Sequence, residues 1–155
     1  MMIRGATTDD LESLVSLNEE VQRLHVRIEP TLFRSDFDAV EIAAFFEGVL
    51  SDPNSIVLLT EQGSMLGYIW TEHQRRLATP FSPKRERIYL HHISIAEAAR
   101  RKGVGSALLK AAEREAAQVG VSRIVLEAWA SNHSAVEFFT EAGYSAFNLV
   151  MARNL

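Results

Sequence analysis

Apolar and polar positions recur along this chain with two different periods, and the changes of period predict the order of helices and strands. Residues 2–6 predict a short strand, and "TTDD" after it favours the start of a helix. Two helical patterns follow, separated by Pro30, and Ser35 or Asp36 can open the second. Their apolar positions are Leu14, Leu17, Val21 and Leu24, then Ile42, Phe45, Phe46, Val49 and Leu50.

The middle of the chain has the pattern of strands. Residues 55–70 contain two apolar runs around a glycine-containing turn at 61–64, which predicts a hairpin. Residues 74–87 are basic, hold two prolines, and are predicted to form a surface loop. Residues 88–95, "IYLHHISI", are rich in β-branched and aromatic side chains and predict a buried strand.

The last third returns to helical spacing. The strongest helical pattern covers residues 105–119 and stops at Gly120. A strand is predicted over 122–130, then a helix that ends before Gly143, and residues 144–155 are expected to supply a closing strand or hairpin. The resulting order, β-αα-ββ-β-α-β-α-β, predicts a mixed α/β sheet in one domain over residues 1–155.

Composition narrows the possible functions. The chain has 155 residues, 47% of them apolar, and a net charge of −4, which is typical of a globular protein and gives no general affinity for nucleic acid or anionic membranes. Because it has no cysteine, disulfides, thiolate zinc sites and a cysteine nucleophile are excluded. No apolar run is long enough to span a membrane. A cytoplasmic protein is therefore expected, with no nucleic-acid or membrane partner.

A cationic glycine turn precedes the strongest helix. Arg100, Arg101 and Lys102 stand directly before Gly103 and Gly105. Free amides at a helix start attract anions, and glycine lets the backbone approach them closely, so the turn favours a phosphate site. It lacks GxxxxGK[ST], and Leu108 replaces the third glycine of GxGxxG, so neither nucleotide motif is present. A helix that merely follows a basic loop is the alternative.

Two stretches in the second half resemble the GNAT superfamily of acetyl-CoA-dependent N-acetyltransferases. The first is Arg100-x-x-Gly103-x-Gly105, between "ISI" and "SALLKAAEREA". The second is "EAWASNHSAVEFFTEAGY", with Asn132 and Phe139 at the family's spacing. The resemblance implies an α/β (α+β) domain whose mixed, mostly antiparallel sheet is flanked by helices, with central strands 88–95 and 123–128 splayed apart.

The resemblance also implies how acetyl-CoA binds. The pantetheine would pair with the backbone of the 88–95 strand, as an added strand does, and the pyrophosphate would lie on the amides of residues 101–106. The implied coenzyme-binding residues are Ile93, Ser94, Ile95, Arg100, Arg101, Lys102, Gly103, Val104, Gly105, Ser106, Asn132 and Phe139. Many relatives have tyrosine where this chain has Phe139, which cannot donate a proton to the thioester sulfur.

Candidate acid–base residues lie on the 88–95 strand. Strict alternation would place Tyr89, His91, Ile93 and Ile95 on one face and His92 on the other. Histidine has an ordinary pKa near 6.5, which suits a general base, so His91 is the candidate base, and Tyr89 or a water could replace the missing acid. His91 could equally be a packed sheet residue, with water as the base. Because His91 and His92 are expected to point apart, no metal site is expected.

These features predict direct transfer of an acetyl group from acetyl-CoA to a primary amine of a small molecule or peptide. The alternative is a GNAT-like module that binds an acyl-CoA without efficient transfer, which Phe139 favours. The segments expected to wall the acceptor site include His25, Arg27, Glu29 and Phe33. A homodimer is expected by analogy with relatives.

Overall fold

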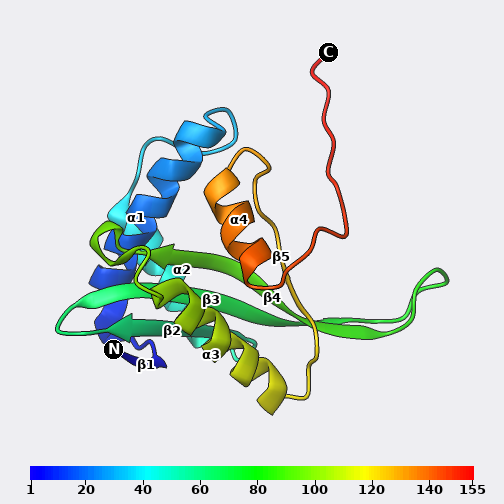
Figure 1. The fold of residues 1–155 in the computed structure, drawn as a ribbon, viewed down its shortest axis with the longest axis horizontal. Coiled ribbons are helices and arrows are strands. Elements are labelled where there is room, and N and C mark those ends of the chain that lie inside the picture. The colour runs from blue at the N-terminus through cyan, green and yellow to red at the C-terminus, as the bar shows by residue number, and fades with distance from the viewer.

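The computed structural model describes residues 1–155 as one five-stranded sheet with helices against both of its faces (Figure 1). The sheet order is β1-β2-β3-β4-β5; the pairs β1–β2, β2–β3 and β3–β4 are antiparallel, and the pair β4–β5 is parallel. The strands are β1 Met2–Gly5, β2 Ser55–Glu61, β3 Met65–Arg76, β4 Arg85–Ile95 and β5 Ile124–Leu126. The predicted mixed, mostly antiparallel fold is confirmed.

Four α-helices and two short 3-10 helices complete the fold. The α-helices are α1 Leu11–Ile28, α2 Ala39–Ser51, α3 Val104–Gln118 and α4 His133–Glu141, and the 3-10 helices are η1 Thr8–Asp10 and η2 Glu97–Ala99. The four α-helices lie where the helical patterns predict them. None of the helices has the combination of length and apolarity that a membrane crossing requires.

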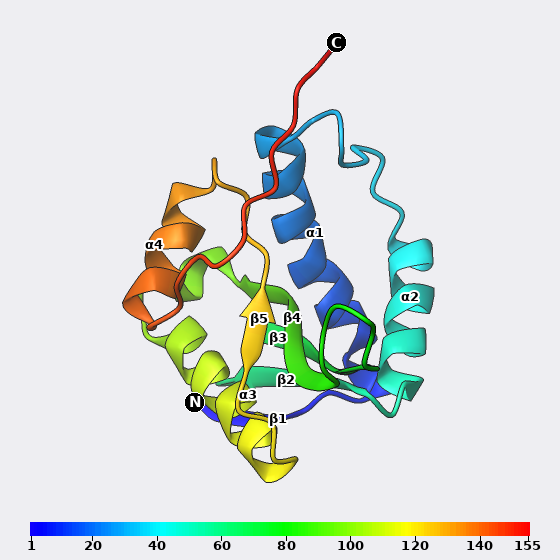
Figure 2. The ribbon, with the colours of Figure 1, turned by 90° about the vertical axis from the view of Figure 1, so that its right-hand side faces the viewer.

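The sheet separates two apolar cores, and each one identifies the helices that cover a face. On one face, Leu14 of α1 and Phe46 of α2 are fully buried with Leu59 and Tyr68 of the sheet. On the other, Leu108 of α3 and Phe139 of α4 pack with side chains from β3 and β4. Figure 2 shows α1 and α2 on one side of the sheet and α3 and α4 on the other.

The basic stretch 74–87 differs from its prediction as a loop. β3 continues to Arg76 and β4 begins at Arg85, and these two residues pair across the hairpin. The hairpin therefore extends as an arm beyond the helices (Figure 1), and only residues 77–84 form its loop. Consecutive residues of the arm are polar because both of its faces are largely open to solvent, and backbone pairing joins its two strands.

The predicted closing strand or hairpin at 144–155 is wrong. These residues form no strand, and most of them are exposed. Both ribbon views show the segment leaving the body of the protein after α4 (Figures 1 and 2). Within this chain β5 pairs with β4 alone, so its second edge is free.

Candidate active site

A β-bulge in β4 is the central feature of the site. His92 pairs with Trp70 of β3, whereas Leu90 pairs with Thr71, so His91 is the extra residue between them. A bulge inserts one residue and changes which face the following side chains occupy. The side chains of His91 and His92 consequently lie on the same face, the one that α1 and α2 cover.

Ring contacts confirm this placement of the histidines. The His91 ring stacks on Trp70 with centroids 4.1 Å apart, and the His92 ring meets the same indole edge-on at 5.2 Å. Ile93 and Ile95, in contrast, pack against the core beneath α3. The expectation that His91 shares a face with these isoleucines is wrong, because strict alternation breaks at the bulge.

Glu72 on β3 forms a hydrogen bond with His91. Its Oε2 lies 2.7 Å from His91 Nε2, and both side chains are partly exposed. Burial disfavours the charged carboxylate, but hydrogen bonds from Gln74 and His91 outweigh it, and the pKa of Glu72 lies below its ordinary value. Sequence reasoning missed Glu72; its only signal was a carboxylate directly after the five buried residues 67–71 of β3.

Tyr89 lies beside this pair. It is the cross-strand partner of Glu72, and its ring centroid is 4.8 Å from that of His91. Burial and the neighbouring Glu127 carboxylate raise the pKa of Tyr89, so its phenol keeps its proton at neutral pH. Tyr89 and His91, the two predicted acid–base candidates, are therefore brought together.

His92 belongs to a largely buried polar cluster beside the partly exposed pair of His91 and Glu72. Its Nδ1 is 3.4 Å from the Tyr68 hydroxyl and 3.5 Å from Asn18 Nδ2, and Asn18 also donates to Tyr68 at 3.2 Å. Burial, with smaller contributions from His91 and His25, lowers the pKa of His92 to about 4. His92 is neutral at physiological pH and serves the packing of α1 on the sheet.

β4 and β5 separate immediately beyond this cluster. Their pairing ends at Leu90 and Leu126, while β4 continues to Ile95 beside β3 alone. The Ala96 amide donates to the Leu66 carbonyl at 2.9 Å, and antiparallel pairs alternate between bonded and non-bonded. The backbone groups of Ile93 and Ile95 therefore point away from β3, toward the side that β5 leaves open.

The cationic turn at the end of this opening presents unbonded amides. Outside helices and strands, no backbone hydrogen bond has an amide of residues 101–106 as its donor. A helix that begins at Val104 also leaves its first amides without helical partners. Arg101 and the N-cap residue Gly103 have φ angles of 59° and 79°, and such left-handed turns orient successive amides to one side.

Comparison with known proteins identifies the family. The model of the acetyltransferase (GNAT) family matches residues 18–144, which include the bulge, the opening and the turn. This chain belongs to the GNAT family. The resemblance of the two motifs is thereby confirmed.

Individual relatives agree with the family assignment. The uncharacterized N-acetyltransferase YdgE of Bacillus subtilis (strain 168) is 28% identical over 98 residues, which are 63% of this chain and 59% of that relative. A mutant of the BH1408 protein from Bacillus halodurans has a TM-score of 0.94 at 23% identity, over 100% of this chain and 99% of its own. A predicted acetyltransferase from Clostridium acetobutylicum, solved with acetyl-CoA, has a TM-score of 0.74 at 18% identity, over 99% and 95% of the two chains.

In this GNAT chain, several predicted coenzyme-binding side chains have other partners. The Arg100 guanidinium donates to the Ile95 carbonyl at 3.1 Å and to Glu20 of α1 at 3.3 Å. The Ser94 hydroxyl donates to the Leu17 carbonyl at 2.8 Å, on the face of α1. Ser94 therefore anchors α1, and its side chain does not face the open side of β4.

The residues of the second motif are also engaged. Asn132 is the N-cap of α4, and its side chain accepts a hydrogen bond from the Ala135 amide at 3.2 Å. Phe139 is 8% exposed and part of the core below α3. Gly105 packs closely against α4, because a methyl group added there would lie 3.0 Å from Phe138. The two glycines of the first motif therefore have different roles: Gly103 belongs to the turn, and Gly105 allows α3 to pack closely against α4.

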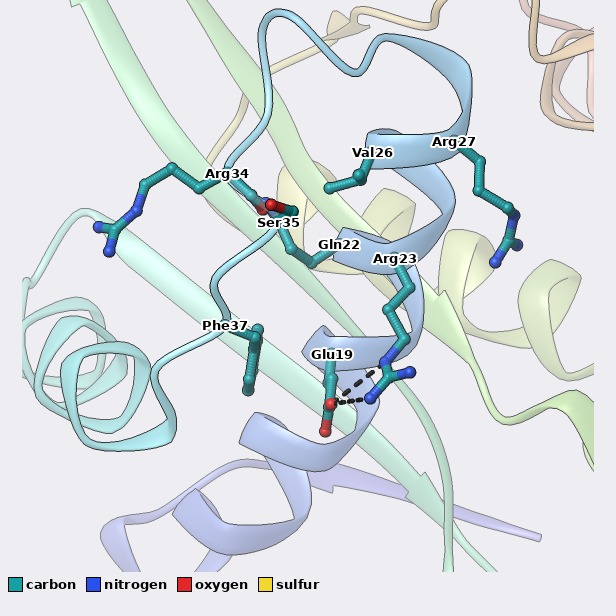
Figure 3. A pocket seen from close by; sticks show the side chains of 8 residues that line it. All are labelled: Glu19, Gln22, Arg23, Val26, Arg27, Arg34, Ser35 and Phe37. Atoms are coloured by element: carbon teal, nitrogen blue, oxygen red, sulfur yellow. Dashed lines mark hydrogen bonds and ion pairs between the residues drawn. The ribbon is translucent and has the colours of Figure 1, made fainter.

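Two further regions concern the acceptor. The Phe33 ring stacks on His25 at 4.7 Å and meets Trp129 edge-on at 5.5 Å, which joins α1 to the segment after β5. A pocket of about 340 Å³ lies between α1 and residues 34–37 (Figure 3). Its lining contains Arg23, which is paired with Glu19, and Arg27, but none of the predicted acid–base or coenzyme residues.

Proposed function

We propose that this chain is an N-acetyltransferase that transfers the acetyl group of acetyl-CoA directly to a primary amine. The observation that carries the proposal is the unpaired backbone at the open side of β4 and at the turn that follows it. It consists of the backbone groups of Ile93, the amide of Ile95, whose carbonyl accepts from Arg100, and the free amides of residues 101–106. An extended amide-containing arm that ends in a pyrophosphate matches both parts, the first as an added strand and the second as an anion.

The placement of the acid–base residues supports transfer. His91 lies in the bulge next to the point where β4 and β5 part, so its side chain is close to the end of a pantetheine arm laid along Ile93 and Ile95. Glu72 accepts a hydrogen bond from His91 Nε2. That bond leaves Nδ1 of the neutral imidazole as the nitrogen with a free lone pair for an incoming proton.

Because the chain has no cysteine to serve as a thiol nucleophile, direct attack of the amine on the thioester is the economical route. His91 takes a proton from the acceptor ammonium, and the neutral amine attacks the thioester carbonyl to form the C–N bond. The C–S bond then breaks, coenzyme A leaves as the thiolate, and the second proton lost from the amine nitrogen passes through water to that thiolate, which gives the amide and the free thiol. Deprotonating a lysine-like ammonium at pH 7.4 costs about 4 kcal/mol, whereas leaving a thiolate of pKa near 8.5 unprotonated costs about 1.5 kcal/mol. The base therefore matters more than the acid that Phe139 replaces.

A steady-state assay tests the proposal. Purified protein is incubated with acetyl-CoA and a panel of primary amines, and free thiol is measured. We expect amine-dependent thiol release that His91→Gln lowers by roughly 100-fold, as for the loss of a general base. The matched control is His133→Gln on the exposed start of α4, which leaves the rate unchanged.

Coenzyme binding is tested separately by calorimetry. Gly103→Ala places a side chain at a φ of 79°, in open space, and so disturbs the turn without a clash. We expect acetyl-CoA to bind the native chain saturably and the variant more weakly. Absence of binding at millimolar acetyl-CoA would end both this proposal and its alternative.

The alternative is a module that binds an acyl-CoA without efficient transfer. The burial of Phe139 favours it, since α4 places no hydroxyl at the position where many relatives carry the tyrosine acid. Native coenzyme affinity with no thiol release across the amine panel would establish the module, and release with any amine at an enzymatic rate would exclude it.

A further inference from the structure

The β3–β4 arm ends in a loop, residues 77–84, that carries exposed apolar side chains. Phe81 is 98% exposed and Leu77 is 80% exposed. Both lie at the end of the arm, which extends beyond the helices (Figure 1). Neither side chain belongs to one of the apolar cores, so packing within the chain does not account for them.

Hydrogen bonds within the arm loop hold Phe81 outward. The Thr79 hydroxyl oxygen accepts from the amides of Phe81 at 3.2 Å and Ser82 at 3.1 Å. The Thr79 amide donates to the Ser82 carbonyl at 2.9 Å. The two other residues of the stretch 79–83 are prolines, which have no N–H. Every backbone N–H over 79–83 is therefore either bonded inside the loop or absent.

A loop without free N–H groups suits an apolar medium. An amide that leaves water without a hydrogen-bond partner costs free energy, and the interior of a bilayer offers it none. Residues 79–83 avoid this cost. Proteins that bind nucleic acid, in contrast, use backbone N–H groups as phosphate contacts. The end of the arm therefore fits a lipid surface better than a nucleic acid.

Two cations without partners lie directly behind the arm loop. Arg76 and Arg85 are cross-strand neighbours, and both are exposed. Like charges opposite each other on paired strands repel. Glu86 is the only carboxylate in residues 74–87. It pairs with His73, Arg75 and Lys84. An external anion would therefore relieve the repulsion between Arg76 and Arg85.

The distance between these two arginines and the end of the arm fits the depth of a membrane interface. Residues 77–80 and 81–84 connect Arg76 to Arg85, and four extended residues span at most about 14 Å. The apolar side chains of interfacial segments enter the boundary between headgroups and acyl chains by about 5–10 Å. The Phe81 ring can reach this depth while both guanidinium groups stay at the level of the lipid phosphates.

We propose that the arm loop is a docking site for anionic lipid bilayers. Leu77 and Phe81 enter the headgroup–acyl boundary, and Arg76 and Arg85 bind lipid phosphates. The expectation of no membrane partner rested on the net charge of the whole chain, −4, whereas residues 74–87 hold five cations and one carboxylate. Docking is independent of acetyl transfer, so its test needs neither acetyl-CoA nor an amine.

Vesicle sedimentation tests the apolar contribution. The full chain is mixed with vesicles of equimolar phosphatidylcholine and phosphatidylglycerol. We expect the native chain to sediment with them and Phe81→Ser to bind about tenfold more weakly, because the phenyl group no longer leaves water. Phe147→Ser is the matched control, since Phe147 is 64% exposed and lies beyond α4, and it should keep the native affinity. Circular dichroism confirms that each variant is folded.

The same assay tests the two arginines. The double variant Arg76→Gln, Arg85→Gln should bind these vesicles about 30-fold more weakly, the effect of two cations at an anionic surface. Its control, Lys110→Gln with Arg114→Gln, removes the same charge from exposed positions of α3 and should bind as the native chain does. Vesicles of phosphatidylcholine alone should bind the native chain and the Arg76, Arg85 variant equally weakly.

Fluorescence quenching locates the end of the arm relative to the bilayer. Phe81→Trp is bound to the mixed vesicles with brominated acyl chains, and we expect stronger quenching than in the native chain, whose Trp70 and Trp129 lie outside the arm. The proposal would be overturned by a native chain that does not sediment, by equal affinity of Phe81→Ser, by no added quenching, or by binding of single-stranded DNA in place of vesicles.

Discussion

At the scale of single residues, the chemistry of the site depends on His91 and Glu72, which lie 19 positions apart and meet across two strands. His91 was predictable as a candidate because the GNAT resemblance directs attention to this strand. Glu72 was not, because a lone carboxylate in a strand has no sequence partner until the strand register is known. A one-residue slip would have placed it on the other face.

Glu72 is expected to position His91 for proton transfer. Replacing it with glutamine removes the charged acceptor but keeps the shape, so we expect Glu72→Gln to lower kcat by roughly 10-fold while the KM for acetyl-CoA stays unchanged. Steady-state kinetics measure both constants. Glu86→Gln is the matched control, because Glu86 bonds to His73 at 2.8 Å on the same two strands, out on the arm. Equal losses in both variants would contradict the assignment.

Thr60 is expected to tolerate the loss of its hydroxyl. It is fully buried on β2, and its Oγ1 has no hydrogen-bond partner. Because valine has nearly the same shape, Thr60→Val should leave the free energy of unfolding unchanged or raise it by up to about 1 kcal/mol. Ser94→Ala, which removes the buried bond to Leu17, should lower it by about 1 kcal/mol. Urea denaturation compares the two, and a loss in Thr60→Val would reveal a missing partner.

At the scale of the elements, the glycines of the turn have two separate functions. Gly103 has a left-handed φ of 79° and open space beside it, whereas Gly105 lies against Phe138 of α4. The sequence motif combines them, and only the structure separates backbone conformation from helix packing. The bulge in β4 is likewise visible only in the structure. It places the side chains of His91 and His92 on one face of the sheet and those of Ile93 and Ile95 on the other.

Two helical glycines should respond oppositely to alanine. Gly105→Ala brings a methyl group 3.0 Å from Phe138, and we expect α4 to shift and the free energy of unfolding to fall by about 1 kcal/mol. Gly48→Ala in α2 meets nothing within 4 Å, so the better helix propensity of alanine should raise it by about 0.5–1 kcal/mol. Chemical denaturation measures both, and an increase in Gly105→Ala would show that α4 accommodates the methyl group.

At the scale of the whole molecule, the free energy of unfolding should depend on pH through the partly buried His92. Its folded pKa of about 4 lies below the ordinary value of 6.5, so the unfolded chain binds more protons between these values. The contribution of His92 is therefore present above about pH 6.5 and is lost as the pH falls toward 4, and the loss between pH 7 and pH 5 is about 2 kcal/mol. Urea unfolding between pH 5 and 7 measures it. His92→Gln should flatten the profile, and His133→Gln should not.

The overall architecture was predictable to different degrees along the chain. The four α-helices and the 88–95 strand could be predicted from the spacing of apolar residues, since each of these elements buries at least one of them in the core. The arm of the β3–β4 hairpin and the exposed residues 144–155 could not be predicted from the sequence. Neither segment packs against a core, so neither needs a regular spacing of apolar residues. Whether a strand-like segment pairs depends on a partner edge, which local sequence does not contain.

The sequence by itself determined the helices, the family motifs and the cationic turn whose glycines free the amides of residues 101–106. Each of these depends on interactions among near neighbours in the chain, so spacing alone encodes them. The tertiary structure alone decided that Glu72 meets His91, that the bulge brings His91 and His92 against Trp70, and that residues 144–155 form no strand. Strand register and sheet edges are long-range properties, and a single shifted residue reverses which side chains meet.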